Sequence, residues 1–172
     1  MKREYLEQDV YQALQERLRF LFEEFENIYL SFSGVNDSGL LLNLLLYFQK
    51  KYYPERKIGV FHQDFEAQYT KTSEYVERTF ERIKDDVEPF WVCLPMATRT
   101  ALSSYEMYWY PWDNKKKELW VREMPDKEYV INLENNPITT YRYRMHQEDL
   151  AKQFGRWYKT AHGNKKTVCI LG

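Results

Sequence analysis

Short apolar, β-rich segments alternate with longer amphipathic segments along this chain, and this alternation is the feature that most limits its fold. The segments with strand character are residues 27–32, 57–62, 89–94 and 167–171, each bounded by turn-forming residues. Between them lie segments whose apolar residues recur at helical spacing. Strands joined by such helices usually pair in parallel. We therefore expect an α/β fold with a doubly wound, mainly parallel sheet and helices on both faces.

The expected helices differ in how they are buried. Residues 8–25, 72–85 and 140–158 each carry one apolar stripe, which is typical of a helix with one face on the core. Residues 39–53 are apolar nearly all round, so we expect this helix to be buried on more than one side. Pro54 marks its end, because the residue before a proline disfavours helical geometry.

Length and charge limit the class of protein. The 172 residues suit one domain, since domains usually run to ~100–200 residues. Lys and Arg total 25 and Asp and Glu total 26, and this balance argues against a general polyanion-binding protein. The first ten residues are too charged for a signal peptide, and the longest apolar run, residues 40–48, is too short to span a bilayer. We expect a cytoplasmic protein with no membrane partner.

The two cysteines, Cys93 and Cys169, are far apart in the sequence and form no Cys-x-x-Cys motif. Both lie in apolar runs. We expect both thiols to be buried and inert.

Glycine and small polar residues follow the first expected strand. Residues 33–38 read Ser-Gly-Val-Asn-Asp-Ser and directly precede the leucine-rich helix. Gly34 allows close approach of a ligand, while the helix start offers unpaired N–H groups and partial positive charge, which together favour an anion. Hydroxyl donors come from Ser31, Ser33 and Ser38. An ordinary strand–helix turn capped by Asp37 or Ser38 explains the same residues, and composition alone favours that turn.

The same segment carries a family resemblance. Residues 33–38 resemble the Ser-Gly-Gly-Lys-Asp-Ser pyrophosphate-binding loop of the adenine nucleotide alpha-hydrolase-like superfamily, which includes ATP pyrophosphatases, ATP sulfurylase small subunits and phosphoadenosine phosphosulfate (PAPS) reductases. Residues 53–68, 91–100 and 136–150 resemble PAPS reductase-like proteins of the immunoglobulin-binding regulator A group. The resemblance extends over essentially the whole chain. It implies one PAPS reductase-like nucleotide-binding domain over residues 1–172.

The resemblance also implies roles for individual residues. The phosphates of ATP, or of a PAPS-like adenine nucleotide, would lie against Ser31, Ser33, Gly34, Asp37 and Ser38. Asp64, at the end of the second expected strand, matches an acidic residue that lies close to the nucleotide in the reductases. Asp37 and Asp64 are thus the candidate catalytic residues, and Asp37 is the candidate Mg²⁺ ligand.

Basic residues near the last helix are further candidates for a phosphate or sulfate. They are Arg142, Arg144, His146 and Arg156. Solvent-exposed helix charges are an equally good interpretation of all four.

Several departures from the family pattern bear on activity. Val35 replaces the second loop glycine, and its branched side chain is expected to narrow the anion site. Asn36 replaces the loop lysine and cannot neutralise phosphate charge. The Thr-Gly that usually follows the acidic residue is Phe65-Glu66 here. The chain also stops after the fourth expected strand, where related proteins continue, and the C-terminal catalytic cysteine motif of true PAPS reductases is absent.

Two functions follow from these observations. An active protein of this family would cleave ATP between the α and β phosphates, with Mg²⁺, and activate an acceptor as an adenylate. Alternatively, the chain is a catalytically inactive, shortened member that regulates gene expression or binds a partner protein. A sheet that ends at the fourth strand would leave that strand as an edge, where a homodimer or another protein partner can dock.

Residues 96–136 interrupt the strand–helix alternation. They are rich in tyrosine and tryptophan and contain three consecutive lysines at 115–117. This mixture suits base stacking and backbone contacts to a nucleic acid. It equally suits an aromatic subcluster or a protein interface, and we favour this second interpretation because the net charge is close to zero. We treat the segment as a long insertion with short elements of its own.

Overall fold

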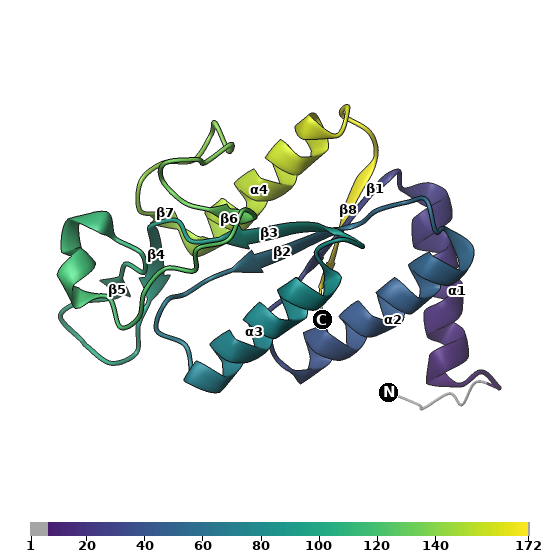
Figure 1. Cartoon of the computed structure of the whole chain (residues 1–172), viewed down its shortest axis with the longest axis horizontal. Helices are drawn as coiled ribbons and strands as arrows, with labels where there is room; N and C mark the ends of the chain where they lie inside the picture. The colour runs from purple at the N-terminus through teal and green to yellow at the C-terminus, as the bar shows by residue number, and fades with distance from the viewer. Residues whose placement is uncertain (1–6, 172) are drawn as a thin grey trace, which may run out of the picture.

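The computed structural model describes residues 7–171 (Figure 1). Its helices are α1 (Val10–Glu24), α2 (Asn36–Tyr52), α3 (Thr70–Ile83), α4 (Gln147–Ala161) and the short 3₁₀ helix η1 (Asn114–Leu119). Its strands are β1 (Asn27–Ser31), β2 (Gly59–Gln63), β3 (Glu88–Val92), β4 (Met96–Arg99), β5 (Tyr108–Trp109), β6 (Val130–Ile131), β7 (Met145–His146) and β8 (Thr167–Leu171). Every helix and strand expected from the sequence is present, and the boundaries shift by at most three residues except at α4, which starts later than expected.

The main sheet has the order β6-β3-β2-β1-β8, and every neighbouring pair is parallel. The chain steps from β1 to β2 to β3 in one direction and then returns to place β8 on the other side of β1. Right-handed crossovers in opposite directions place their helices on opposite faces. Accordingly α2 and α3 cover one face and α4 covers the other (Figure 1). The expected doubly wound α/β fold is confirmed.

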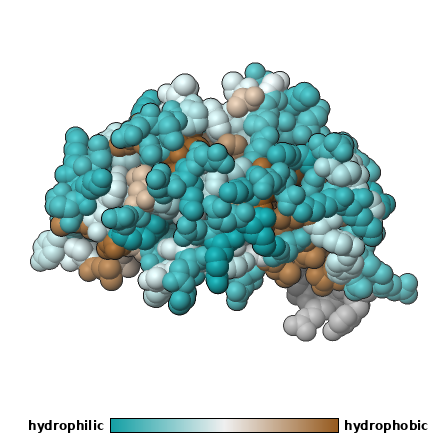
Figure 2. Space-filling view, in the orientation of Figure 1, coloured by the Kyte–Doolittle hydropathy of each residue, from teal (hydrophilic) through white to brown (hydrophobic). Residues whose placement is uncertain are grey.

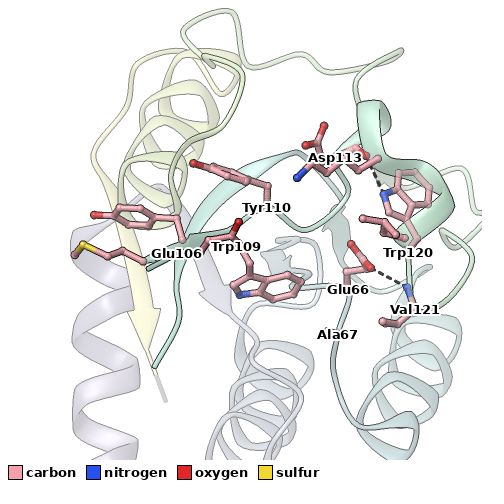
Figure 3. A pocket seen from close by; sticks show the side chains of 12 residues that line it. Glu66, Ala67, Glu106, Trp109, Tyr110, Asp113, Trp120 and Val121 are labelled. Carbon is pink, nitrogen blue, oxygen red and sulfur yellow. Dashed lines mark hydrogen bonds between the residues drawn. The ribbon is translucent and has the colours of Figure 1, made fainter. Parts of the chain in front are cut away.

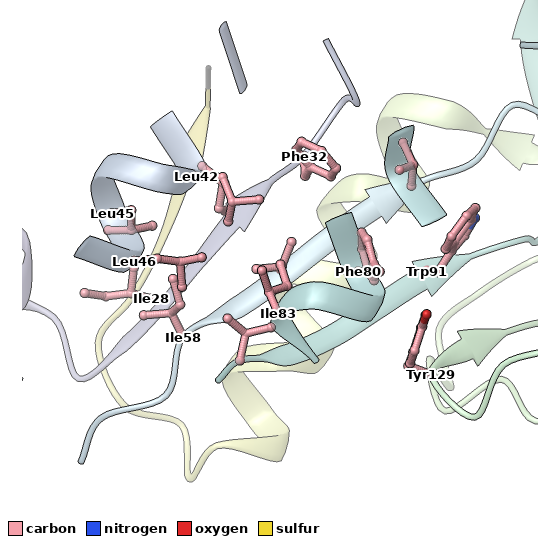
Figure 4. Packing of buried hydrophobic residues seen from close by; sticks show 14 of the residues in the cluster. Ile28, Phe32, Leu42, Leu45, Leu46, Ile58, Phe80, Ile83, Trp91 and Tyr129 are labelled. Carbon is pink, nitrogen blue, oxygen red and sulfur yellow. The ribbon is translucent and has the colours of Figure 1, made fainter. Parts of the chain in front are cut away.

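Two hydrophobic clusters occupy the two faces of the sheet. Alternation along β1 directs Ile28 and Leu30 toward α2 and α3, and Tyr29 toward α4. Figure 4 shows the first cluster, in which leucines of α2 and Phe80 of α3 lie over the strands. The second cluster is smaller. There α4 approaches the sheet closely at Gly155, where an added Cβ would come within 2.6 Å of the Tyr29 hydroxyl oxygen.

The start of α4 differs from the prediction. The sequence pattern places a helix over residues 140–158, but α4 begins only at Gln147. Turns precede it, with hydrogen bonds from Tyr141 N to Ile138 O and from Met145 N to Arg142 O. Arg144 has a φ of 57°, which a continuing right-handed helix cannot accommodate. Turn geometry therefore overrides an apolar spacing that continues through this segment.

The strands within residues 96–136 pair with one another and also with strands outside this segment. β4 pairs with β5 inside the segment and with β7 outside it, which forms a small three-stranded sheet. β6 joins the main sheet beside β3. Figure 1 shows the η1 and β5 end of this segment projecting beyond the ends of β2 and β3.

β8 forms the edge of the main sheet, since within the described residues it pairs only with β1. One prediction fails at this edge. Cys93 is buried as expected, but Cys169 is exposed. α4 packs on Tyr29, Phe61 and Phe90 and does not extend over β8, so the side chain of Cys169 on that face has no cover. Within residues 7–171, no helix combines the length and apolar character that a membrane span requires.

Candidate functional site

The loop at residues 33–38 lies between the carboxyl end of β1 and the start of α2. Gly34 has a φ of 81°, a conformation that favours glycine, and this turns the chain from the strand into the helix. Val35 is the N-cap residue and makes no side-chain capping hydrogen bond. The first turn of α2 therefore presents N–H groups that no side chain caps, together with the positive end of the helix dipole.

The two serine hydroxyls of this loop are hydrogen-bonded to one another. Ser38 is only 1% exposed, and its hydroxyl donates to the carbonyl oxygen of Val35 at 3.1 Å. The Ser33 and Ser38 oxygens are 2.8 Å apart, so Ser33 is the donor in that pair. Ser33 itself is exposed. A ligand at this loop would thus meet Ser33 first and find Ser38 holding the turn in shape.

A hollow of about 410 Å³ opens beside the loop, between the first turns of α2 and α3. The α2 side is formed by Gly34, Asn36 and Gly39, and the α3 side is formed by Lys71, Thr72 and Tyr75. The Tyr75 hydroxyl lies directly against α2, because a Cβ built on Gly39 would come within 2.5 Å of it. Sequence reasoning missed Lys71 and Tyr75. Their place in the first turns of a helix that follows a parallel strand was the available signal.

Lys71 brings positive charge to this hollow. Its ammonium group is 2.7 Å from a carboxylate oxygen of Glu74 in the same helix, and its side chain is 87% exposed. Asn36 on the opposite wall is neutral. Among the residues that line the hollow, the cationic side chain thus lies on the α3 side and not on the α2 side.

Val35 and Asp37 occupy exposed positions at the start of α2. Val35 has a φ of −114° and is 53% exposed, so its side chain fills no buried space in the loop. Asp37, in the first helical turn, is also exposed. The described residues contain no group of three or more His, Cys, Asp or Glu side chains placed to hold a metal ion. Mg²⁺ commonly binds through one or two carboxylates plus substrate phosphates, so a single carboxylate such as Asp37 fits that mode.

Asp64 follows β2 directly and is 0% exposed. Its carboxylate accepts hydrogen bonds from the indole N–H of Trp91 at 2.6 Å, from the backbone N–H of Glu66 at 2.7 Å, and from the Arg122 guanidinium at 2.5 and 2.6 Å. In this structure the Asp64 carboxylate binds the insertion to the sheet and has no surface open to a ligand.

The remaining predicted residues lie away from the hollow. Ser31 ends β1 on the face of Tyr29, which α4 covers. Arg142 is exposed in the turn before β7. Arg144 donates to a buried carboxylate, Asp113, and lies 4.4 Å from the ring centre of Tyr110. The structure thus groups Ser33, Gly34, Asp37 and Ser38 at one loop and places Ser31, Arg142 and Arg144 elsewhere.

A second hollow, of about 510 Å³, lies within the insertion and was not anticipated from the sequence. We call it the aromatic pocket, and its walls include Glu66, Trp109, Tyr110, Asp113 and Trp120 (Figure 3). Figure 3 shows Trp109 and Tyr110 on one side of the space and Glu66 and Trp120 on the other. Exposed apolar side chains also belong to this segment: Leu102, Tyr105, Met107, Leu119 and Val121. In Figure 2 most of the visible surface is hydrophilic, with smaller hydrophobic patches between the polar side chains and along the lower edge.

Comparison with known proteins adds one relative. The chain is 30% identical over 151 residues to the uncharacterized protein YbdN of Escherichia coli (strain K12), and the match covers 87% of the chain. It covers 36% of YbdN, so the chain spans about a third of the length of this relative. No family model matches the chain, and no solved structure matches it.

Proposed function

We propose that this chain binds ATP or a related adenine nucleotide, such as PAPS, through the loop at residues 33–38. One observation carries the proposal. The uncapped first turn of α2, entered through Gly34 at positive φ, faces a hollow that lies at the carboxyl end of a parallel sheet. Anions bind at helix starts because unpaired N–H groups and the helix dipole meet there. The resemblance of this loop to pyrophosphate-binding loops supports the same ligand.

Two charged groups complete the proposed site. Lys71, across the hollow, would offset phosphate charge in place of the missing loop lysine. Asp37 would hold Mg²⁺ together with the phosphates, and the metal would supply further positive charge. The Tyr75 hydroxyl, beside Gly39, would add a hydrogen-bond donor at the same wall.

The second candidate is nucleotide binding without turnover, in a protein that acts through a regulatory or protein partner. The position of Asp64 favours it. The resemblance implies that Asp64 is a catalytic residue close to the nucleotide, yet its carboxylate is fully buried and bound to Arg122 and Trp91. The open edge of β8 offers a surface on which a protein partner or a second copy can add a strand.

Calorimetric titration with ATP and Mg²⁺ tests nucleotide binding. We expect saturable binding that Ser38→Ala weakens by about tenfold, because two hydrogen bonds that shape the loop are lost. Ser103→Ala is the matched control, since this serine lies in the insertion. No heat of binding at millimolar ATP, or equal loss in both variants, would contradict the proposal.

A gain of function sharpens this test. The double change Val35→Gly and Asn36→Lys restores the family loop, and we expect it to raise the affinity for ATP. An unchanged affinity would count against a weakened phosphate site. Release of AMP and pyrophosphate by wild-type protein would support the active enzyme, and binding without release would support the second candidate.

A further inference from the structure

The aromatic pocket contains a buried carboxylate with no counter-ion of its own. Glu66 is 4% exposed, and its two carboxylate oxygens accept backbone N–H groups from Trp112 at 2.8 Å and from Val121 at 2.9 Å. These donors are neutral. Within residues 7–171 the Glu66 carboxylate forms no ion pair, and the nearby Arg122 donates instead to the Glu66 carbonyl and to Asp64.

Among the described residues, Glu66 is the buried carboxylate of the pocket wall that forms no ion pair. Of the two buried carboxylates that line the pocket, Asp113 is paired with Arg144 and Glu66 is unpaired. Asp64, which does not line the pocket, is paired with Arg122. At the rim, Lys116 and Glu106 are both exposed and opposite in sign, so they offset one another and are screened by solvent. Lys117, beside Trp120, is also exposed and screened by solvent, whereas the buried Glu66 carboxylate is screened less.

The aromatic rings of the pocket also favour a positively charged ligand. A cation over the face of an aromatic ring is attracted by the negative face of the ring. Tyr110 and Trp120 already carry Arg144 and Lys117 near their rings, at 4.4 and 5.5 Å from the ring centres. Trp109 also lines the pocket, and no lysine or arginine of the described chain lies over its ring. Trp109 and Tyr108 are the lining rings left for a ligand, and Trp109 is the more buried of the two.

Backbone strain is concentrated around this pocket. Glu66, Trp112 and Arg144 have φ values of 61°, 55° and 57°, and a bulky side chain makes such values costly. Such conformations persist only where surrounding contacts impose them. The chain therefore holds a carboxylate at position 66 against its backbone preference.

We propose that the aromatic pocket binds a small organic cation of the alkylammonium class. The Glu66 carboxylate provides the opposite charge, and the Trp109 ring provides the cation–π face. The volume of about 510 Å³ lies in the range of small-molecule sites. A phosphate-bearing ligand such as a nucleic acid is disfavoured at this pocket, because the uncompensated carboxylate would repel it.

Choline and its uncharged isostere 3,3-dimethylbutan-1-ol form the decisive pair of probes. The two share shape and apolar surface, so only the charge differs. We expect the protein to bind choline at least about tenfold more tightly than the alcohol, as calorimetry or ligand-observed NMR will measure. Equal affinity, or no choline binding, would overturn the proposal. A blocked peptide carrying trimethyllysine is the second arm. Tighter binding of the peptide than of choline assigns the cation to a protein side chain, and weaker binding assigns it to a free amine.

Variants of the pocket separate charge from packing. Trp109→Phe keeps an aromatic face and Trp109→Leu removes it, so we expect choline affinity to fall in the order wild type, Phe, Leu. Tyr105→Ala is the control, because Tyr105 is 96% exposed and does not line the pocket. Glu66→Gln should abolish the preference for choline over the alcohol, and a folded Gln variant that retains this preference would contradict the role of Glu66. ATP binding is measured in the same variants. The test of the cation site depends only on the choline data, so it stands whether or not ATP binds.

Discussion

The loop at residues 33–38 and the aromatic pocket lie beyond neighbouring strands of one sheet, yet they are constructed differently. The loop presents backbone N–H groups and exposed side chains, and the cation beside it, Lys71, is an exposed lysine. The pocket uses buried carboxylates, indoles and arginines joined by hydrogen bonds over long sequence distances. A short motif can specify the first kind of site. The second depends on the whole fold, and so a family resemblance reveals only the first.

The largest expected effect distinguishes a structural from a catalytic role for Asp64. Asp64→Asn leaves the Arg122 charge without its partner in a mostly buried site, and we expect a loss of about 3–5 kcal/mol in the free energy of unfolding. Asp86→Asn, which breaks the exposed pair with Lys50, should cost about 0–1 kcal/mol. Urea denaturation measures both. If Asp64→Asn instead abolishes ATP binding with unchanged stability, Asp64 belongs to the nucleotide site.

The next largest effect is expected from alanine substitution of Gly34, with Gly163 as the comparison. Gly34→Ala combines positive φ with a Cβ only 2.5 Å from a Val76 methyl carbon, and we expect it to cost about 1–3 kcal/mol and to impair ATP binding. Gly163→Ala has a similar φ, 76°, but nothing within 4 Å of the added Cβ. It carries the strain of the positive φ alone, so it should cost about 1–2 kcal/mol and less than Gly34→Ala. Equal costs in urea denaturation would show that the contact with α3 does not hold the loop.

The pH dependence of the free energy of unfolding tests the buried state of His62, which contacts the chain just before the loop. His62 is buried, its Nδ1 is 2.7 Å from the carbonyl oxygen of Phe32, and burial lowers its pKa below the usual 6.5 despite the nearby Asp64 carboxylate. Below about pH 6.5 the unfolded chain binds a proton that the folded chain does not, so stability falls with acidification, by up to ~1.4 kcal/mol per pH unit, until the folded pKa is reached. His62→Asn should remove this part of the pH dependence. A slope unchanged relative to wild type would show that His62 titrates normally.

The smallest expected effect concerns Lys71. Lys71→Ala should weaken ATP binding by about threefold to tenfold and reduce its salt dependence, because an exposed cation contributes modestly. Lys152→Ala removes a similar exposed lysine that pairs with an acid three residues away, in α4. Titration of both variants at two salt concentrations measures the difference. Identical affinities would remove Lys71 from the proposed site.

The parts of the fold that follow from local pattern were predictable. The strands around Tyr29 and Val60 and the leucine-rich α2 have periods that a short window reveals. The start of α4 was not, because the turn at Arg144 ends a helical pattern that apolar spacing continues. Nor was the exposure of Cys169, because local composition does not show how far a helix covers an edge strand, even though residues 167–171 were expected to form one.

The candidate site divides in the same way. Residues around Gly34 were identified from the sequence because their chemistry is contiguous. The burial of Asp64 depends on Arg122, 58 residues later, and no sequence window of helical or strand length joins the two. Glu66 gave one local signal, a departure from the Thr-Gly of the resembled family, but its contacts with the backbone of Val121 are equally distant in sequence.

The bond between Asp64 and Arg122 also orders events in folding. Closing this 58-residue segment costs slightly more entropy than closing the shorter segments between neighbouring strands, by roughly 0.6 kcal/mol for each doubling of length. We therefore expect β1, β2 and β3, whose contacts form over shorter separations, to assemble first and to present Asp64 as an anchor. The walls around Trp109 and Glu66 close last. In hydrogen exchange, the amides of Trp112 and Val121 should accordingly exchange sooner than those of the central strands.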